Sequence, residues 1–259
     1  MVAQDEFLFH FEGEFEMNKA KYISSILFNN SLCENSYLND LPIIKYLAAN
    51  KELNFSSNIT FFVGENGTGK STLLEAIAVA YGFNAEGGTK NFSFSTKDTH
   101  SELSEHLTLT RRDYAKDGFF LRAESLYNAA TYIDEVKATH NYGNVSLHNQ
   151  SHGESFLSIV QNRFSGNGLY LLDEPEAALS PMRLMTLIVE IDSLLKSNSQ
   201  FIIATHSPIL MAFPNAEILQ FSESGIEKVK YYETEHYKTT KIFIEEPERM
   251  IHNLIDSNN

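Results

Sequence analysis

The stretch ITFFVGENGTGKS, residues 59–71, decides the fold of this chain. An apolar run leads into a glycine-rich turn, and a helix-forming segment follows from Thr72. The turn fits the pattern G-x-x-x-x-G-K-[ST], whose glycines let backbone N–H groups curl toward a polyphosphate. The dipole of the following helix favours the same anion. The pattern therefore predicts a strand, a phosphate-binding loop and a helix.

Individual residues of this loop have distinct expected roles. Lys70 would reach the β- and γ-phosphates, and Ser71 would hold Mg²⁺. The other residues expected to bind the nucleotide are Gly64, Asn66, Gly67, Thr68, Gly69 and Thr72. The alternative is an ordinary glycine-rich turn between a strand and a helix, which the Lys-Ser pair and both flanks disfavour.

The composition is that of an acidic globular protein. Of its 259 residues, 21% are charged and 42% are hydrophobic, and the formal net charge is −14. We expect a single domain over residues 1–259, with a P-loop core in residues 1–90 and 155–259 and an inserted lobe in residues 91–154. The acidic balance argues against nucleic-acid binding by this chain alone, so a local patch or a basic partner would have to supply the phosphate contacts.

Apolar runs, the single cysteine and the histidines indicate which kinds of protein this chain is not expected to be. The chain has no apolar run long enough to span a membrane and no basic-then-apolar segment after Met1, so we expect a cytoplasmic protein without a transmembrane segment. The single cysteine, Cys33, cannot form an internal disulfide or a multi-cysteine metal site. His140 and His148 lack ligand partners at a recognisable spacing, which favours a solvated loop over a metal site.

The spacing of apolar residues along the chain predicts alternating helices and strands. Helices are expected over residues 41–54, with Asp40 as N-cap, and over residues 125–136, 155–164, 181–196 and 246–255. Strands are expected over residues 1–17, 59–63, 169–172, 201–204, 217–221 and 227–232, and as a pair, 107–111 and 118–123, joined by a turn. This order predicts an α/β fold with a phosphate loop.

Residues 169–176, LYLLDEPE, deliver two adjacent acids at the end of a buried strand. Adjacent residues on a strand point to opposite sides, so the two acids should do different jobs. Asp173 fits a partner of Mg²⁺, usually through water, and Glu174 fits the base that orients or deprotonates the attacking water. Alone, such a pair is as often a surface acid cluster, but its place after the phosphate loop favours catalysis.

Two further elements fall where α/β sites are built. His206 ends the next apolar strand, where it would hydrogen-bond the γ-phosphate and sense its loss. Residues 151–155, SHGES, put a serine and a glycine at the N-terminus of a predicted helix, which makes a second anion-binding element. One active site does not obviously need two such elements. If two subunits face head to tail, each would supply its own phosphate loop and lend this second element to the nucleotide of the other.

The motifs GENGTGKS, SHGES, LLDEPEAALS and ATHS, in this order, resemble the nucleotide-binding domain of the ABC ATPase superfamily. The resemblance covers roughly residues 55–215. It implies that residues 64–71 are Walker A and that Asp173 ends Walker B. It also implies a catalytic glutamate at Glu174, a switch histidine at His206 and a D-loop at residues 178–181, including Ser180. The signature motif would be Ser151, His152, Gly153 and Glu154, acting on the nucleotide of the partner subunit.

Within that superfamily the chain is similar to stand-alone bacterial ATPases related to the SMC and OLD-type group. This similarity rests on the sequence Gly-Glu-Asn-Gly in the phosphate loop, the segment ATHSP and the short inserted lobe. It implies an ATPase that uses ATP and Mg²⁺. Its homodimer would close on ATP and open on hydrolysis to drive a protein partner, in DNA repair or defence.

The sequence also departs from the superfamily pattern. No glutamine lies between Lys70 and Asn149, so the Q-loop residue has no clear match, and residues 91–96 or 122–124 would replace it. In many ATPases of this class an aromatic residue near the N-terminus stacks on adenine. The eligible residues here are Tyr22, Phe28, Tyr37 and Phe55, and the sequence does not choose among them.

Three other functions compete with this interpretation. The ATP-binding subunit of a transporter would need a groove for a coupling helix and usually a clear Q-loop. An ATP-dependent binding switch with negligible turnover would not need Glu174 and His206. A small-molecule P-loop kinase would account for residues 64–71 but leaves SHGES and His206 without a role.

Overall fold

A computed structural model describes residues 21–29, 32, 35–89, 102–135, 142 and 146–256. The strands of its central sheet are β3 (Ile59–Gly64), β5 (Asp117–Arg122), β6 (Gly168–Asp173), β7 (Gln200–Ala204), β8 (Glu217–Ser222) and β9 (Gly225–Val229). Their order is β5-β6-β7-β3-β8-β9. All neighbours pair in parallel except β8 and β9, which form an antiparallel hairpin. The expected α/β fold is confirmed, and the antiparallel pair makes its central sheet a mixed one.

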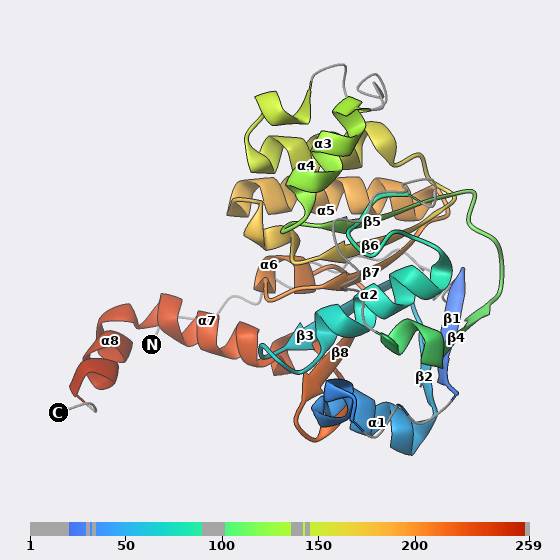
Figure 1. Ribbon diagram of the computed structural model, residues 1–259. Coiled ribbons are helices and arrows are strands. Elements are labelled where there is room, and N and C mark those ends of the chain that lie inside the picture. The colour runs from blue at the N-terminus through green and yellow to red at the C-terminus, as the bar shows by residue number, and fades with distance from the viewer. Residues whose placement is uncertain are drawn as a thin grey trace.

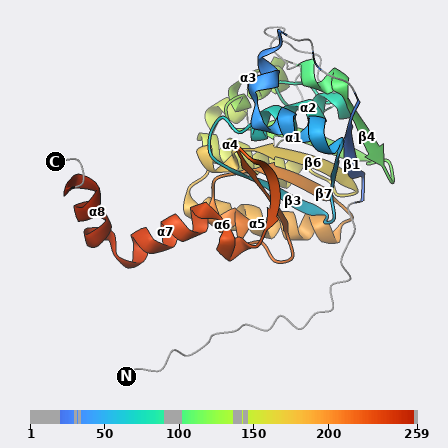
Figure 2. The same ribbon diagram turned by 90° about the horizontal axis from the view of Figure 1, so that it is seen from below.

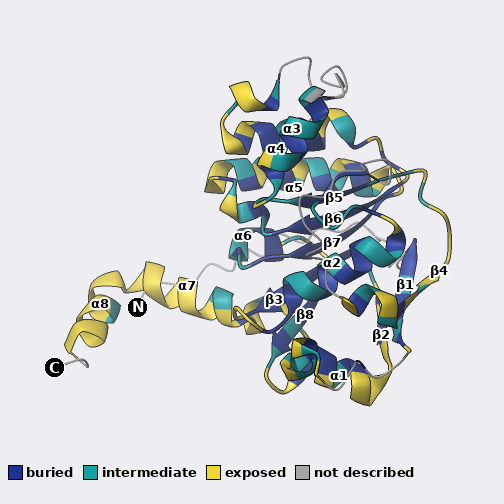
Figure 3. Ribbon diagram, in the orientation of Figure 1, coloured by how far each residue is buried: buried dark blue, intermediate teal, exposed yellow. Residues whose placement is uncertain are grey.

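Helices cover both faces of this sheet, which is why the central strands are continuously apolar. One face packs against α2 (Lys70–Tyr81), where Leu73 and Ile77 meet Phe62. The other face packs against α4 (His152–Arg163) and α5 (Pro181–Lys196), where Phe156 and Leu187 meet Phe61. Figure 1 shows these two layers, with α3 (Leu126–Glu135) outside α4. The strands β3, β6 and β7 are buried at every residue (Figure 3).

A second, small antiparallel sheet lies beside α2. It contains β1 (Ile23–Phe28), β2 (Glu52–Asn54) and β4 (Leu107–Arg111) in the order β2-β1-β4. The predicted pair of strands at residues 107–123 therefore exists, but the predicted hairpin was wrong. The half-exposed β4 pairs with β1, whereas the apolar run in β5 pairs with β6 inside the central sheet. A buried parallel neighbour suits such a run better than an exposed hairpin does.

The helix predicted over residues 41–54 is shorter than expected. Helix α1 spans Pro42–Asn50 and stops because Lys51 adopts a left-handed conformation, with φ of 63°. The residues that follow it pair with β1 as β2. Leu41 is the N-cap, and Asp40 instead ends a short 3-10 turn, Tyr37–Asp40, so the predicted cap was also wrong.

Several sequence predictions fall wholly or partly outside the described residues. These are the strand at residues 1–17, the loop at 91–96, Cys33 and His140. Strand β5 comes from the segment expected as an inserted lobe and lies in the central sheet. The division into core and lobe stays a prediction.

The chain ends in a helical arm that extends away from the body (Figures 1 and 2). After the short helix α6 (Pro208–Met211) and the hairpin β8-β9, the arm consists of α7 (Glu235–Glu245) and α8 (Pro247–Asp256). The second of these helices was expected from the sequence and the first was not. None of the residues in either helix is buried (Figure 3).

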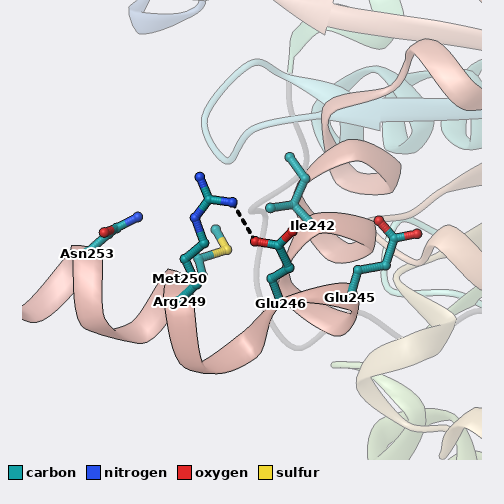
Figure 4. A pocket seen from close by; sticks show the side chains of 6 residues that line it. All are labelled: Ile242, Glu245, Glu246, Arg249, Met250 and Asn253. Atoms are coloured by element: carbon teal, nitrogen blue, oxygen red, sulfur yellow. Dashed lines mark hydrogen bonds and ion pairs between the residues drawn. The ribbon is translucent and has the colours of Figure 1, made fainter.

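A groove of about 280 Å³ lies where the two arm helices meet (Figure 4). Ile242 and Met250 line it, and an ion pair of 2.7 Å joins Arg249 to Glu246 at its rim. Among the helices that the structure describes, none combines the length and the apolar character needed to cross a membrane.

Candidate active site

The phosphate loop has the curled backbone that its motif requires. It joins the end of β3 to the start of α2, and Gly64, Gly67 and Gly69 have φ angles of 135°, 82° and 95°. A Cβ at Gly64 would lie 2.2 Å from the carbonyl oxygen of Phe221, and one at Gly69 would lie 2.3 Å from Cγ2 of Ile43. Both positions therefore need glycine for space as well as for conformation.

Lys70 is held inside this loop. Its side chain is buried, and Nζ donates hydrogen bonds of 2.8 Å to the carbonyl oxygens of Gly64 and of Glu65. Burial lowers the pKa of Lys70, while Glu174 and other nearby carboxylates oppose that change by favouring the charged form. An ammonium group has three donors, so one N–H is left for an anion at the mouth of the loop.

The structure brings the two expected Mg²⁺ ligands together. Ser71 Oγ donates a 2.9 Å hydrogen bond to Oδ1 of Asp173, at the carboxyl end of β6. The Asp173 side chain is 6% exposed. Burial raises the pKa of Asp173 to about 6, against the opposing effects of Arg122 and Ser71.

These oxygen atoms suit a hard divalent cation. A hydroxyl and one carboxylate fit Mg²⁺, which keeps several waters and often binds substrate phosphates as well. Within the described ranges no group of three or more His, Cys, Asp or Glu side chains is arranged to hold a metal. A Mg²⁺ ion held by Ser71 and Asp173 would leave room for phosphate and water as further ligands.

Arg122, at the end of β5, links the cation ligands to a wider network. Its Nε lies 3.4 Å from Oδ2 of Asp173, its Nη1 lies 2.8 Å from Oε2 of Glu75, and it forms a further ion pair with Glu124. A pocket of about 310 Å³ opens here, lined by Ser71, Arg122, Ala123, Glu124, His152, Asp173, Glu174, Ala177 and Ala178. Of the two alternatives for the Q-loop, residues 122–124 line this pocket and residues 91–96 lie outside the described residues.

Glu174 comes directly after the end of β6, and its exposure differs from that of its neighbour Asp173. Its side chain is 45% exposed, and its Oε1 lies 3.9 Å from Nε2 of His206. Its backbone is left-handed, with φ of 47°, which is a costly conformation for a residue other than glycine. Asp173 thus faces the half-buried Ser71, while Glu174 lines the same pocket and faces the histidine.

Glu176 is a site residue for which the sequence analysis predicted no role. Its Oε2 accepts a 2.7 Å hydrogen bond from Oγ1 of Thr205, and its Oε1 accepts one from the backbone N–H of His206. These two bonds fix the main chain that carries the histidine. Burial raises the pKa of Glu176, although both hydrogen bonds oppose that change.

His236, in the first turn of α7, is a second residue that sequence reasoning missed. Its Nε2 lies 2.9 Å from Nδ1 of His206, and the two rings meet edge to face with centroids 5.0 Å apart. Burial lowers the pKa of both histidines. No local motif surrounds His236, so only the fold could show this contact.

The remaining loop residues and aromatic candidates have varied environments. Thr68 Oγ1 donates a 2.9 Å hydrogen bond to the carbonyl oxygen of Glu65 and so shapes the loop, whereas Asn66 is exposed and Thr72 is half-buried. Of the four aromatic residues considered for adenine stacking, Tyr37 is 68% exposed. The buried ones are Tyr22, Phe28 and Phe55.

The second anion-binding element starts α4, with Ser151 as N-cap. The N–H and the hydroxyl of Ser151 both donate to Oε2 of Glu154, at 2.9 and 2.8 Å. Arg183 then donates to Ser151 Oγ at 3.1 Å and to Oε1 of Glu154 at 3.0 Å. Ser151 is thus engaged by its own chain in a closed capping box.

The residues that follow Ser151 lie close to the start of α5. A Cβ at Gly153 would lie 2.5 Å from Nη1 of Arg183 and 2.9 Å from the carbonyl oxygen of Ala178. His152 is exposed and lines the same pocket as Ser71. Ser180, the expected D-loop residue, is exposed at the N-cap position of α5.

The chain is similar in sequence or in structure to several known proteins. A family model described as an AAA domain (AAA_23) matches residues 43–251. Structural maintenance of chromosomes protein 6 of Takifugu rubripes is 30% identical over 97 residues, which are 38% of this chain and 9% of that protein's length.

Solved structures of ABC transporters also match. One is cbiO1 from Clostridium perfringens, described as part of the ABC transporter complex cbiONQ. It matches with a TM-score of 0.47 and 17% identity over 91% of this chain and 99% of its own. An ABC transporter in an inward-facing conformation matches with a TM-score of 0.46 and 15% identity over 85% and 88% of the two chains.

Proposed function

Because this chain belongs to the AAA domain family AAA_23, we propose that it binds ATP with Mg²⁺ and hydrolyses it to ADP and phosphate. The observation that carries the proposal is the 2.9 Å hydrogen bond between Ser71 and Asp173. It joins the phosphate loop to the acid strand across the sheet, at the carboxyl ends of parallel strands, where α/β proteins bind their ligands.

The residues around that bond divide the work of hydrolysis. Lys70 would neutralise charge on the phosphates from inside the loop, and it is already oriented by Gly64 and Glu65. Glu174, exposed to the pocket, would orient the attacking water and take its proton. Ser71 and Asp173 would hold Mg²⁺, which would supply further charge neutralisation for the phosphate oxygens.

Phosphate release by the full-length protein tests this function. We expect turnover of ATP that depends on Mg²⁺ and falls about 10²-fold or more in Glu174→Gln, since the variant loses the base. Glu227→Gln makes the same chemical change at an exposed position of β9 and should leave the rate unchanged. Wild-type turnover in Glu174→Gln would remove Glu174 from its role, and no turnover in the wild type would refute hydrolysis.

We also propose that two copies pair head to tail, so that Ser151 and Gly153 of one copy complete the nucleotide site of the other. The exposed position of Ser151, Glu154 and Ser180 supports this arrangement, because a partner can reach them. The molar mass of Glu174→Gln in solution should double on addition of ATP. A monomer mass at saturating ATP would contradict the dimer.

The curated relative suggests where such a machine would act. Its name refers to the maintenance of chromosomes, and we propose that this protein drives a partner in a process on DNA. Because the chain carries a net charge of −14, we expect duplex DNA alone to leave the rate of phosphate release unchanged at physiological salt. A strong stimulation of phosphate release by DNA alone would contradict the proposal that a partner makes the contact with DNA.

A further inference from the structure

We propose that His236 is a positioning residue for His206. Its Nε2–H donates to Nδ1 of His206, and so holds His206 in the tautomer that carries its proton on Nε2. The consequence for catalysis rests on the proposed ATPase function, whereas the tautomer itself is a property of the protein without nucleotide.

The contact between the two rings requires one donor and one acceptor. His206 Nδ1 and His236 Nε2 are 2.9 Å apart, which is the distance of a hydrogen bond from one ring N–H to the lone pair of the other ring. Burial lowers the pKa of both histidines, and the charge of Lys70 acts in the same direction on each. A lowered pKa favours the neutral form of each ring, and a neutral imidazole has one donor and one acceptor nitrogen.

The surroundings of His206 Nε2 decide which ring donates. This atom is buried and has no hydrogen-bond partner among the described residues, and Oε1 of Glu174 lies 3.9 Å away. If His206 donated to His236, Nε2 would be a bare lone pair facing a carboxylate, which is unfavourable. If His236 donates instead, the proton of His206 lies on Nε2 and faces Glu174.

That tautomer is also the useful one for a triphosphate. A phosphate oxygen only accepts hydrogen bonds, so His206 can bind it through Nε2 only if the proton is on that atom. Glu176 holds the backbone of His206 through its N–H, and His236 holds the ring. The two supports come from different elements, the segment after β6 and the first turn of α7.

The second support ties the nucleotide site to the exposed helical arm. His236 is the second residue of α7, and the rest of α7 and α8 extends away from the body (Figure 2). A phosphate that accepts from His206 therefore favours the docked position of α7. By reciprocity, a displacement of the arm weakens the hold of His206 on the phosphate.

Nitrogen NMR of the full-length protein without nucleotide tests the tautomer directly. In the wild type we expect the imidazole ¹⁵N shifts of His206 to show a single tautomer protonated on Nε2. His236→Phe keeps a ring but removes the donor, so His206 should become a mixture of tautomers. His236→Gln places an amide N–H near the same position and should restore the wild-type pattern. A wild-type His206 protonated on Nδ1, or a His236→Phe spectrum identical to that of the wild type, would overturn the inference.

Steady-state kinetics then tests the consequence. We expect His236→Phe to lower kcat about tenfold with a change in KM for ATP below about twofold, the scale seen when an orienting partner is lost. His236→Gln should recover most of the loss. His252→Phe is the matched control, because His252 is an exposed histidine on α8 that pairs with Asp256.

The two readouts separate the possible failures. If the wild type hydrolyses no ATP, the proposed function fails, while the ¹⁵N spectra still decide the role of His236. If His236→Phe does not fold, the wild-type spectrum alone still assigns the tautomer. Unchanged kcat in His236→Phe, with turnover in the wild type, would remove the catalytic consequence.

Discussion

Both the phosphate loop and the start of α4 place glycine and serine next to a helix N-terminus, but their surroundings differ. Helix α2 begins at Lys70 without a side-chain cap, and the lysine is held by carbonyl groups of the loop. Helix α4 begins with a closed capping box, in which Glu154 and Arg183 occupy Ser151. A similar local pattern thus gives an open cradle in one place and a capped helix in the other.

The carboxylates of the two regions differ in the same sense. Burial raises the pKa of Asp173 to about 6, so its charge is costly until a cation arrives. The pKa of Glu154 is lowered by hydrogen bonds from the N–H and the hydroxyl of Ser151, and by Arg183. The phosphate loop region thus holds a buried carboxylate whose charge a bound cation would stabilise, whereas Glu154 in the Ser151 region is already stabilised by hydrogen bonds within the chain.

Lys70→Ala should have the largest effect on the difference between the phosphate loop and the start of α4, because it removes the main cation of the loop. Removing the held ammonium leaves the phosphate charge unopposed, so we expect ATP hydrolysis to fall about 10³-fold or more. Phosphate release and ATP binding are the measurements, and Lys45→Ala, at an exposed position of α1, is the control. A variant that keeps a tenth of the wild-type rate would show that this loop is not the phosphate cradle.

Asp173→Asn should stabilise the protein without nucleotide. It should also weaken the dependence of ATP hydrolysis on Mg²⁺. The folded pKa of about 6 lies above the ordinary value of 3.8, so the native state binds more protons than the unfolded state between these values. The stability of the wild type therefore falls as the pH rises through this window. We expect the free energy of unfolding of the variant to exceed that of the wild type by about 3 kcal/mol at pH 8.

Urea unfolding at two pH values measures this difference. The gap between Asp173→Asn and the wild type should nearly vanish at about pH 4, where Asp173 is largely protonated. Arg122 keeps its partners Glu75 and Glu124 in the variant. A gap of equal size at both pH values would mean that burial of the charge is not its cause.

Ser151→Ala tests whether the capped element acts on another copy. We expect hydrolysis to fall about 10²-fold, as for the loss of one donor to a developing charge. An equal mixture of Ser151→Ala and Lys70→Ala should recover about a quarter of the wild-type rate. Half of the dimers would contain one copy of each variant, and in these dimers one of the two sites would combine an intact Lys70 with an intact Ser151. No recovery in the mixture would argue that Ser151 acts within its own chain or not at all.

Arg183→Gln should have the smallest effect. Its ion pair with Glu154 is partly exposed, and such pairs contribute little to stability. We expect the Tm to fall by less than about 3 °C. If the hydrogen bond from Arg183 keeps Ser151 from reaching a second copy, the ATP-bound dimer should form more readily in the variant. A weaker dimer would show instead that Arg183 contributes to the interface.

The sequence by itself determined the local parts of this protein. The strand, loop and helix around residues 59–81 and the helix α5 follow from apolar spacing, glycine and proline, which act within a few residues. The same spacing placed Asp173 at the end of a buried strand. The expected likeness to SMC-related ABC-type ATPases is confirmed by the family match and by the curated relative.

Only the tertiary structure decided which of these parts meet. The strand order puts β7 between β6 and β3, which brings His206 close to Glu174 and Asp173 close to Ser71. It also separated β4 from β5, and it gave His206 a partner 30 residues further along the chain. Apolar spacing states how deeply a segment is buried but not which neighbour buries it, because that choice depends on contacts between segments far apart in the sequence.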